Sequence, residues 1–349
     1  MGAGRLAPLM PLSRRAFVKG AALAGTAAVG AAVARKVAAV HDAAGAGASP
    51  LAHTHGHGLN DVNGAVSTAD FDPHRYLTEF YWGDKVTPLP DGTSLREYTI
   101  VAEDKDIEVA PGVVYPAWTF NGQLPGPTIR AVEGDTLRIR FVNKSRHPHT
   151  MHFHGFHAAS QDGVPGMGGG NVFPDGELTY EFKADPHGVH LYHCHTLPVK
   201  KHIAKGLYGA YVVDPKDGFG PEAHEMVMVM NSFDTDFDGE NEVYAVNTKA
   251  FAYAHHPIRI RKGQLQRVFL VNVTEHDPIN SMHLHGNFFH YVEVGHKSNP
   301  RRFTDNVALI QGERGMMEFT YERPGRFMFH AHQSEFTELG WMGVFEVEE

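Results

Sequence analysis

His193-Cys194-His195 contains the only cysteine of this 349-residue chain. Successive side chains of a strand point to opposite faces, so Cys194 would face one side while His193 and His195 face the other. A thiolate with imidazole partners suits a copper ion that exchanges one electron, and the flanking imidazoles can serve a second metal. The tripeptide therefore predicts two metal centres joined by one stretch of backbone.

Further His-x-His pairs supply the ligands that a second centre needs. They are His152/His154, His283/His285 and His330/His332, so that eight histidines are paired in this way. An isolated His-x-His is usually a surface accident, but four such pairs beside a single cysteine indicate metal binding.

The pairs belong to a unit that occurs twice. His152-Phe153-His154-Gly155 precedes the cysteine tripeptide by about forty residues, and His283-Leu284-His285-Gly286 precedes His330-Ala331-His332 by a similar interval. Upstream of each unit, in 127–143 and 257–272, apolar and polar residues alternate around a glycine turn. This alternation predicts paired strands with one buried face.

These signatures resemble those of the multicopper oxidases, over most of the chain from about residue 95 to the end. The chain is similar to the two-domain, laccase-like members, which are related to copper nitrite reductases. The resemblance implies an all-β fold of two cupredoxin-like Greek-key β-sandwich domains in tandem. Many short alternating segments separated by Gly, Pro, Asn and Asp agree with that fold.

Length and composition agree with two domains behind an N-terminal leader. We expect a twin-arginine export signal and cleavage region at 1–42 and a His/Gly/Ala-rich linker with an N-terminal extension at 43–84. The first cupredoxin domain would occupy 85–216 and the second 217–349. The signal is indicated by Ser13-Arg14-Arg15, followed by an Ala/Gly-rich apolar stretch that is short for a membrane span. An uncleaved anchor is the alternative to this signal.

Export would place the protein in the periplasm or outside the cell, with no stable membrane insertion after signal cleavage. The net charge of −9 and the absence of a Lys/Arg run in the body of the chain argue against nucleic acid as a partner.

The resemblance assigns a type 1, or blue, copper to His149, Cys194 and His202. His149 stands at the family's spacing before the first His-x-His pair. Val199 occupies the family's usual position for the second imidazole, so His202 closes a longer loop, as in the nitrite reductase branch. At the usual axial position stands Leu207, which cannot coordinate and predicts a high-potential copper. Electrons would enter at an exposed edge of His202.

The second unit lacks a blue site, because Ala331 replaces the cysteine and Asn280 replaces the first imidazole. The resemblance implies that the eight paired histidines hold a trinuclear cluster, which gives four coppers per chain: one type 1, one type 2 and two type 3. Its type 2 copper would be bound by His152 and His283, and its type 3 pair by His154, His193, His195, His285, His330 and His332.

A cluster shared by two domains must lie at a domain interface, and in the two-domain relatives that interface is between subunits. We therefore expect a homotrimer with a cluster at each junction. A cluster formed within one chain is the weaker alternative.

Four coppers can store the four electrons that reduce dioxygen to water. The chain is therefore interpreted as a laccase-like oxidase that takes single electrons from phenols, aromatic amines or metal ions. Asp162 and Glu335, which follow histidine pairs, are candidate proton carriers; a surface or turn carboxylate explains each equally well.

Two other functions compete with the oxidase. A copper nitrite reductase is favoured by the long Cys194-to-His202 loop. It has a mononuclear type 2 copper, however, and does not require His195, His152 or both members of the His330/His332 pair. A non-catalytic periplasmic cupredoxin needs only the blue site, which leaves eight histidines unexplained.

Three other patterns stay open as metal sites. They are the histidines of the linker (His53, His55 and His57), the alternating Met226, Met228 and Met230, and the acidic turn Asp234-x-Asp236-x-Asp238. The last imitates a calcium loop, but Ala245 stands where that loop needs a glutamate. The physiological reducing substrate is not readable from the sequence.

Overall fold

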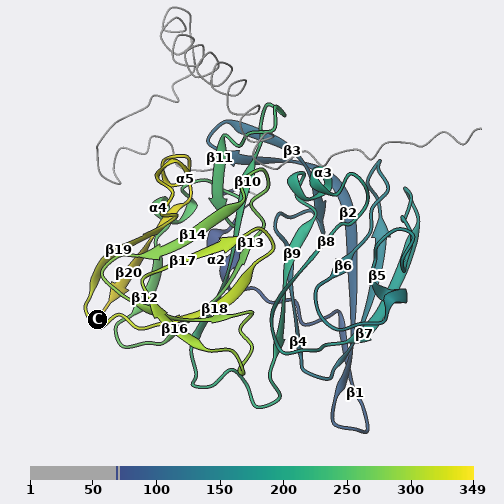
Figure 1. Ribbon diagram of the computed structural model, residues 1–349, viewed down its shortest axis with the longest axis horizontal. Helices are drawn as coiled ribbons and strands as arrows, with labels where there is room; N and C mark the ends of the chain where they lie inside the picture. The colour runs from purple at the N-terminus through teal and green to yellow at the C-terminus, as the bar shows by residue number, and fades with distance from the viewer. Residues whose placement is uncertain (1–67, 70) are drawn as a thin grey trace, which may run out of the picture. The chain divides into compact units, whose positions relative to one another are not determined.

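The computed structural model describes residues 68–69 and 71–349, which form two β-sandwiches (Figure 1). The export signal, its cleavage region and the three linker histidines lie outside the described residues. In Figure 1 the first sandwich runs from blue to teal and the second from green to yellow. The described residues form mostly strands, and the few helices between them are short. The all-β prediction is therefore confirmed.

The first sandwich has a five-stranded and a four-stranded sheet. One sheet has the order β1-β2-β5-β7 with β3 beside β2, and comprises β1 (Lys85–Pro88), β2 (Ser94–Ala110), β3 (Val113–Phe120), β5 (Thr136–Asn143) and β7 (Glu177–Lys183). The other has the order β4-β9-β8-β6, and comprises β4 (Gly126–Val132), β6 (His152–Phe153), β8 (Gly188–His193) and β9 (Tyr208–Asp214).

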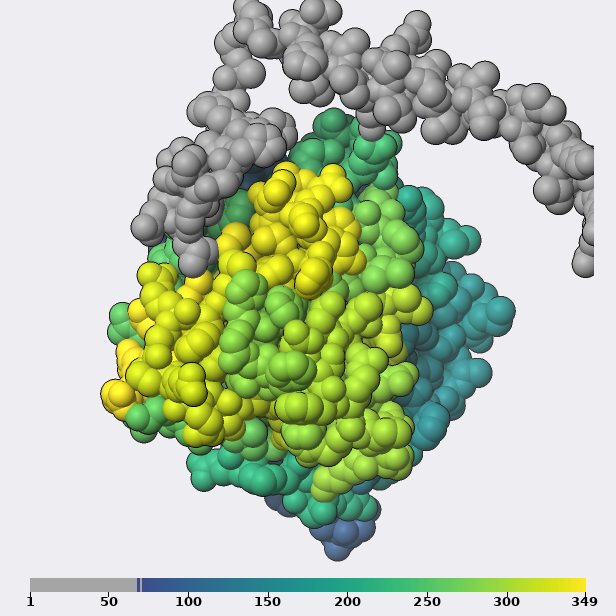
Figure 2. All heavy atoms as spheres, turned by 60° about the vertical axis from the view of Figure 1, so that its left-hand side comes forward, coloured from purple at the N-terminus to yellow at the C-terminus, as the bar shows by residue number. Residues whose placement is uncertain are grey.

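The second sandwich has a six-stranded and a five-stranded sheet. The six-stranded order is β11-β10-β13-β18-β15-β16, with β10 (His224–Phe233), β11 (Val243–Val246), β13 (Gln266–Asn272), β15 (Phe289–Glu293), β16 (Arg301–Thr304) and β18 (Arg314–Phe319). The other order is β12-β20-β19-β14-β17, with β12 (Ile258–Arg261), β14 (Ile279–Leu284), β17 (Asn306–Ile310), β19 (Gly325–His330) and β20 (Met342–Glu348). Figure 2 shows a face formed mostly by this green-to-yellow half of the chain.

Short helices lie between the strands. They are α2 (Pro73–Thr78), α3 (Val199–Ala204), α4 (Ala252–His255), α5 (Ser334–Glu338) and the 3-10 turn η2 (Ala159–Gln161). In the part of the chain that the structure describes, no helix has the length and apolar character to span a membrane.

The prediction of paired strands around each glycine turn is wrong. Strand β4 pairs with β9, whereas β5 pairs with β2 and β7 in the opposite sheet. The second unit repeats this arrangement, with β12 and β13 in different sheets. Gly134 (φ +91°) and Gly263 (φ +75°) sit in the connecting turns, where positive φ suits glycine and lets the chain cross between the layers.

Three hydrophobic cores hold the fold. One lies inside the first sandwich and includes Phe141 and Cys194, and another lies inside the second and includes Met282 and Trp341. The third is shared, because residues of β8 and β9 pack against residues of β10 and β13. For this reason β13 is buried along its whole length and does not alternate. Burying apolar surface stabilises a contact by about 25 cal/mol per Å², so this shared core holds the two sandwiches together.

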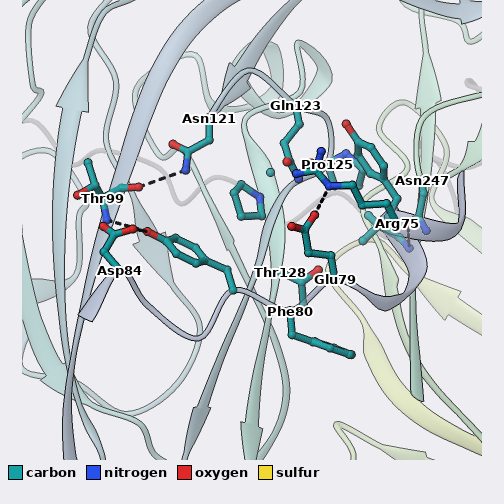
Figure 3. A pocket seen from close by; sticks show the side chains of 15 residues that line it. Arg75, Glu79, Phe80, Asp84, Thr99, Asn121, Gln123, Pro125, Thr128 and Asn247 are labelled. Atoms are coloured by element: carbon teal, nitrogen blue, oxygen red, sulfur yellow. Dashed lines mark hydrogen bonds and ion pairs between the residues drawn. The ribbon is translucent and has the colours of Figure 1, made fainter. Parts of the chain in front are cut away.

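The N-terminal extension folds onto both sandwiches. Leu77 of α2 belongs to the core of the second, and Tyr81 forms a β-bridge with Ile129 of the first. A cavity of about 380 Å³ lies beside α2 (Figure 3). Its charged groups are already engaged, since Arg75 pairs with Glu79 and Tyr81 donates to Asp84.

Candidate metal centres

The predicted blue-site residues converge in the first sandwich. His149 Nδ1 lies 3.1 Å from His202 Nδ1, and Cys194 Sγ lies 3.3 Å from His202 Nδ1 and 3.9 Å from His149 Nδ1. Cys194 follows the end of β8, and the long loop after it winds into α3, which turns His202 back toward the sulfur. The short helix α3 thus shortens the path of the segment between Cys194 and His202, which are eight residues apart in the chain.

Hydrogen bonds orient these groups. His149 Nε2 donates to Ser145 Oγ at 2.9 Å, which leaves the Nδ1 lone pair directed at the thiol. The backbone N–H of Thr150 donates to Cys194 Sγ at 3.3 Å. Three lone-pair atoms therefore point at one position, at mutual distances that suit a common metal ion.

Burial sets the charge states of this site. It lowers the pKa of His149 to about 3 and that of His202 to about 4, so both imidazoles are neutral near pH 7. Burial also raises the pKa of the Cys194 thiol, despite the hydrogen bonds from Thr150 and Thr196. Two neutral imidazoles and a sulfur that only a bound cation would ionise fit a copper site.

The four histidines of the first sandwich form a half-site. His152 of β6 lies opposite His193 of β8, and the Nε2 atoms of His154 and His193 are 3.3 Å apart. The ring of His195 lies 5.3 Å from that of His152. His152 Nδ1 donates to the backbone oxygen of Asp162 at 2.7 Å, which frees Nε2 for a metal.

The four histidines of the second sandwich repeat this geometry. His283 of β14 lies opposite His330 of β19, and the Nε2 atoms of His285 and His330 are 2.9 Å apart. His283 Nδ1 donates to the backbone oxygen of Asp305 at 2.8 Å, as His152 does to Asp162. His332 completes the group, with its ring 5.3 Å from that of His283.

The two half-sites are separate groups within the described chain. Clusters of potential ligands combine histidines of one sandwich only, and among the described residues no ring contact or hydrogen bond joins the two sets. The second half-site is open to solvent, since His285 and His332 are exposed, whereas the histidines of the first half-site are buried or half-buried. Exposed apolar side chains lie nearby in sequence, such as Phe156, Leu197 and the stacked pair Phe288 and Phe303.

A backbone link connects the blue site to the first half-site. Cys194 lies in the buried core, while the rings of His193 and His195 stack on each other with centroids 5.8 Å apart. His193 Nδ1 donates to the carbonyl oxygen of Cys194 at 2.9 Å. Covalent bonds and this hydrogen bond therefore both lead from the thiol to a cluster histidine.

The two candidate proton carriers lie differently. Asp162 Oδ1 is 3.3 Å from His152 Nδ1 and 3.8 Å from His157 Nε2. Glu335 is exposed in α5, and among the described residues its carboxylate makes no hydrogen bond or ion pair with a histidine. The structure thus brings Asp162 to the half-site and does not bring Glu335 there.

Sequence reasoning missed several residues of these centres. Asp305 lies at the second half-site, with Oδ2 3.8 Å from His283 Nδ1, but it is 22 residues from that histidine in the chain. Its position directly before β17, the partner of β14, is the signal that could have found it. Ser145 and Trp118 were missed because nothing in their local sequence marks them.

One expectation about the blue site is wrong. His202 is only 4% exposed, so its edge is not open to a donor from solution. The indole of Trp118 covers it, with ring centroids 4.9 Å apart. Leu207 is fully buried in the same core as Cys194, and its axial role stays a prediction.

Two of the open patterns have structural explanations. Met226, Met228 and Met230 are fully buried in the second core, where packing accounts for them. In the acidic turn, Asp234 accepts hydrogen bonds from the backbone N–H groups of Asp238 and Gly239.

Family models described as multicopper oxidase match residues 102–218 and 221–349. A solved structure described as a multicopper oxidase is 52% identical, with a TM-score of 0.78, and the match covers 79% of this chain and 97% of that one. The chain belongs to the multicopper oxidase family. Membership implies copper as the metal of these centres, and the two sandwiches are cupredoxin-like domains.

Other relatives include an oxidase and a nitrite reductase. A blue copper oxidase from Nitrosomonas europaea is 28% identical, with a TM-score of 0.64, over 72% of this chain and 86% of that one. The copper-containing nitrite reductase of Neisseria meningitidis is 31% identical over 254 residues, 66% of this chain and 63% of its own length. The chain thus spans just under two thirds of that curated relative.

Proposed function

We propose that this protein is a laccase-like multicopper oxidase that reduces dioxygen to water with electrons from small reductants. The observation that carries the proposal is the duplication of the four-histidine half-site. His154 and His193 face each other through Nε2 in the first sandwich, as His285 and His330 do in the second. A mononuclear type 2 site would not need both complete sets.

In this proposal His149, Cys194 and His202 hold one type 1 copper, and the eight paired histidines hold one type 2 and two type 3 coppers. Bound copper supplies one-electron redox chemistry at the first site and storage of electrons at the second. The chain keeps water from the first site, since His149 and Cys194 are fully buried. It also fixes the imidazole tautomers through Ser145 and the carbonyls of Asp162 and Asp305.

Reduction of dioxygen to water consumes four protons, which side chains at the cluster must supply. Asp162 is placed to hold a proton between His152 and His157, on the same side as the half-site. Asp305 is the corresponding carboxylate at His283. We assign these two aspartates as the proton carriers, in preference to Glu335.

A homotrimer with a cluster at each subunit junction is the assembly that this proposal requires. Its support is the separation of the half-sites and the exposure of the second one in the single chain. An exposed histidine pair beside exposed aromatic residues is typical of a surface that another subunit covers. Closed cyclic symmetry joins each first half-site to the second half-site of the next chain.

Export by the twin-arginine route to the periplasm or the cell exterior belongs to the same proposal. Its support is the Arg14-Arg15 pair before an apolar stretch. Replacing both arginines by lysine should leave the protein in the cytoplasm, and unchanged export of this variant would contradict the assignment.

Nitrite reductase is the second candidate, favoured by the relative from Neisseria meningitidis. His195→Ala and His332→Ala separate the two functions, because the oxidase needs both histidines in its cluster. We expect both variants to lose dioxygen consumption with a phenolic donor while the blue absorption stays. Turnover of nitrite by wild type, unchanged in these variants, would establish the reductase and reject the oxidase.

A further inference from the structure

A groove of about 940 Å³ lies beside the blue site. Its lining comes from β2 and β3, from α3 and from the loop after β10, so both sandwiches contribute. Trp118 is part of the lining, and its ring centroid lies 5.2 Å from that of His149 and 4.9 Å from that of His202. A molecule in this groove therefore reaches the blue-site imidazoles through one indole ring.

An exposed aromatic side chain faces the same groove. Phe237, which is 57% exposed, lies in the loop after β10, and its ring is 6.0 Å from that of Tyr115. Its backbone has a φ of +63°, a left-handed conformation that is unfavourable for a bulky residue. Strain and exposure together indicate that the loop holds this ring for contact with a flat apolar molecule.

Two lysines of the groove form no ion pair within the described chain. Lys205 Nζ lies 4.7 Å from the ring centroids of both Tyr115 and Phe237, and Lys201 Nζ lies 5.6 Å from that of Trp118. Among the described residues, neither lysine has a carboxylate within ion-pair distance. Burial, with help from Lys201, lowers the pKa of Lys205 to about 8. An anion beside these ammonium groups would offset that loss of hydration.

The carboxylates of the lining have other partners or lie within the loop. Asp104 accepts a hydrogen bond from Ser145 and pairs with Arg146. Asp234 accepts two backbone N–H groups, and Asp238 accepts the N–H of Glu240. Asp106 remains as a single carboxylate against Lys201 and Lys205, so the groove favours an anion although the whole chain carries a net charge of −9.

We propose that this groove binds the reducing substrate, and that the substrate is an aromatic compound carrying a negative charge. Its ring would lie between Trp118 and Phe237, and its anionic group would lie against Lys201 and Lys205. Phenols with a carboxylate substituent satisfy both requirements, whereas cationic aromatic amines and free metal cations do not. This inference rests on the proposed function, because it names the donor class of that oxidase.

The donor reaction balances with dioxygen as the oxidant. Each phenol gives up one electron through the Trp118 contact and one proton, and leaves as a phenoxyl radical. Four phenols and one dioxygen give four phenoxyl radicals and two waters. Trp118 is thus the residue that touches the donor, and the two lysines set its specificity.

Binding can be measured without turnover, with ligands that the oxidase cannot oxidise. We would titrate the copper-loaded protein by calorimetry with 3,5-dimethoxybenzoate and with 3,5-dimethoxybenzamide, which share a ring and differ in charge. We expect the benzoate to bind about tenfold more tightly than the amide, the usual gain from a charge-assisted contact. This preference should shrink as salt is added.

Variants identify the groups responsible. The double variant Lys201→Met/Lys205→Met should bind both ligands with equal affinity, and Lys201→Arg/Lys205→Arg should keep the preference. Phe237→Ser should lower the affinity for both ligands by the same factor. Lys262→Met is the control, since Lys262 pairs with Glu349 and does not line the groove, and it should match wild type.

Three results would overturn the proposal: equal affinity for the two ligands in wild type, no binding of either, or a preference that survives the double methionine variant. These results do not depend on the reaction catalysed. If the protein proves to be a nitrite reductase, the proposed function fails while the benzoate preference can still be present. If dioxygen is consumed and no preference exists, only the donor class is wrong.

Discussion

Mixed trimers offer a strong test of a cluster shared between subunits. One variant, His152→Gln/His154→Gln, disables the first half-site, and another, His283→Gln/His285→Gln, disables the second. Each alone should be inactive, because every junction then lacks half of its ligands. When both are expressed together with different affinity tags, two successive purifications isolate trimers that contain both kinds of chain.

The expected activity follows from the ring. A junction is intact only where a chain with a sound first half-site meets a neighbour with a sound second half-site. Whichever variant is present twice, this occurs at one of the three junctions, so mixed trimers should show about one third of the wild-type dioxygen consumption. The blue site is untouched in both variants, so full blue absorption confirms that the chains are folded. Mixed trimers without activity would refute the shared cluster, and activity in either variant alone would show that the deleted histidines are not essential ligands.

Three other predictions address single side chains. Ser145→Ala removes the hydrogen-bond acceptor of His149 and should weaken copper binding at the blue site about ten- to a hundredfold. Competition with a chelator, followed by the blue absorption band, measures this loss. Ser145→Thr is the control and should restore binding. Asp162→Asn and Asp305→Asn keep the backbone carbonyls that orient the histidines but remove the proton carriers. The kcat for dioxygen reduction should therefore fall about a hundredfold while the copper content stays unchanged. Normal turnover across the pH range would contradict this role. Burial lowers the pKa of His190 from 6.5 to about 4. The contribution of this ring to stability is therefore complete above pH 6.5 and is lost as the pH falls toward 4, which should cost the metal-free protein roughly 3 kcal/mol of unfolding free energy. Urea unfolding of His190→Gln should show a flatter pH dependence than that of wild type.

The sequence was most informative where chemistry depends on short spacings. The strand alternation around Cys194 and the His-x-His pairs placed the ligand sets, because neighbours on a strand have fixed directions. His202 was also predicted as the second imidazole despite the long loop, and the structure places its Nδ1 3.3 Å from Cys194 Sγ. Its exposure was not predictable, since Trp118, which covers it, comes from a strand 84 residues earlier in the chain.

Features that depend on strand pairing were beyond the sequence. The alternating run 127–143 gives no sign that its two strands belong to different sheets, because each strand alternates in the same way in either arrangement. Asp305 reaches His283 only through the pairing of β14 with β17. The uniform burial of β13 follows from the second sandwich packing on the first, which no local pattern encodes.

Copper content tests the central claim most directly. We would count copper per chain in the fully loaded protein and record its optical and paramagnetic spectra. The account predicts four coppers per chain, a strong blue band, a near-ultraviolet shoulder from a coupled pair, and dioxygen consumption that yields water. Two coppers per chain without a coupled pair, with turnover of nitrite, would contradict it, and a single copper without turnover would leave only an electron carrier.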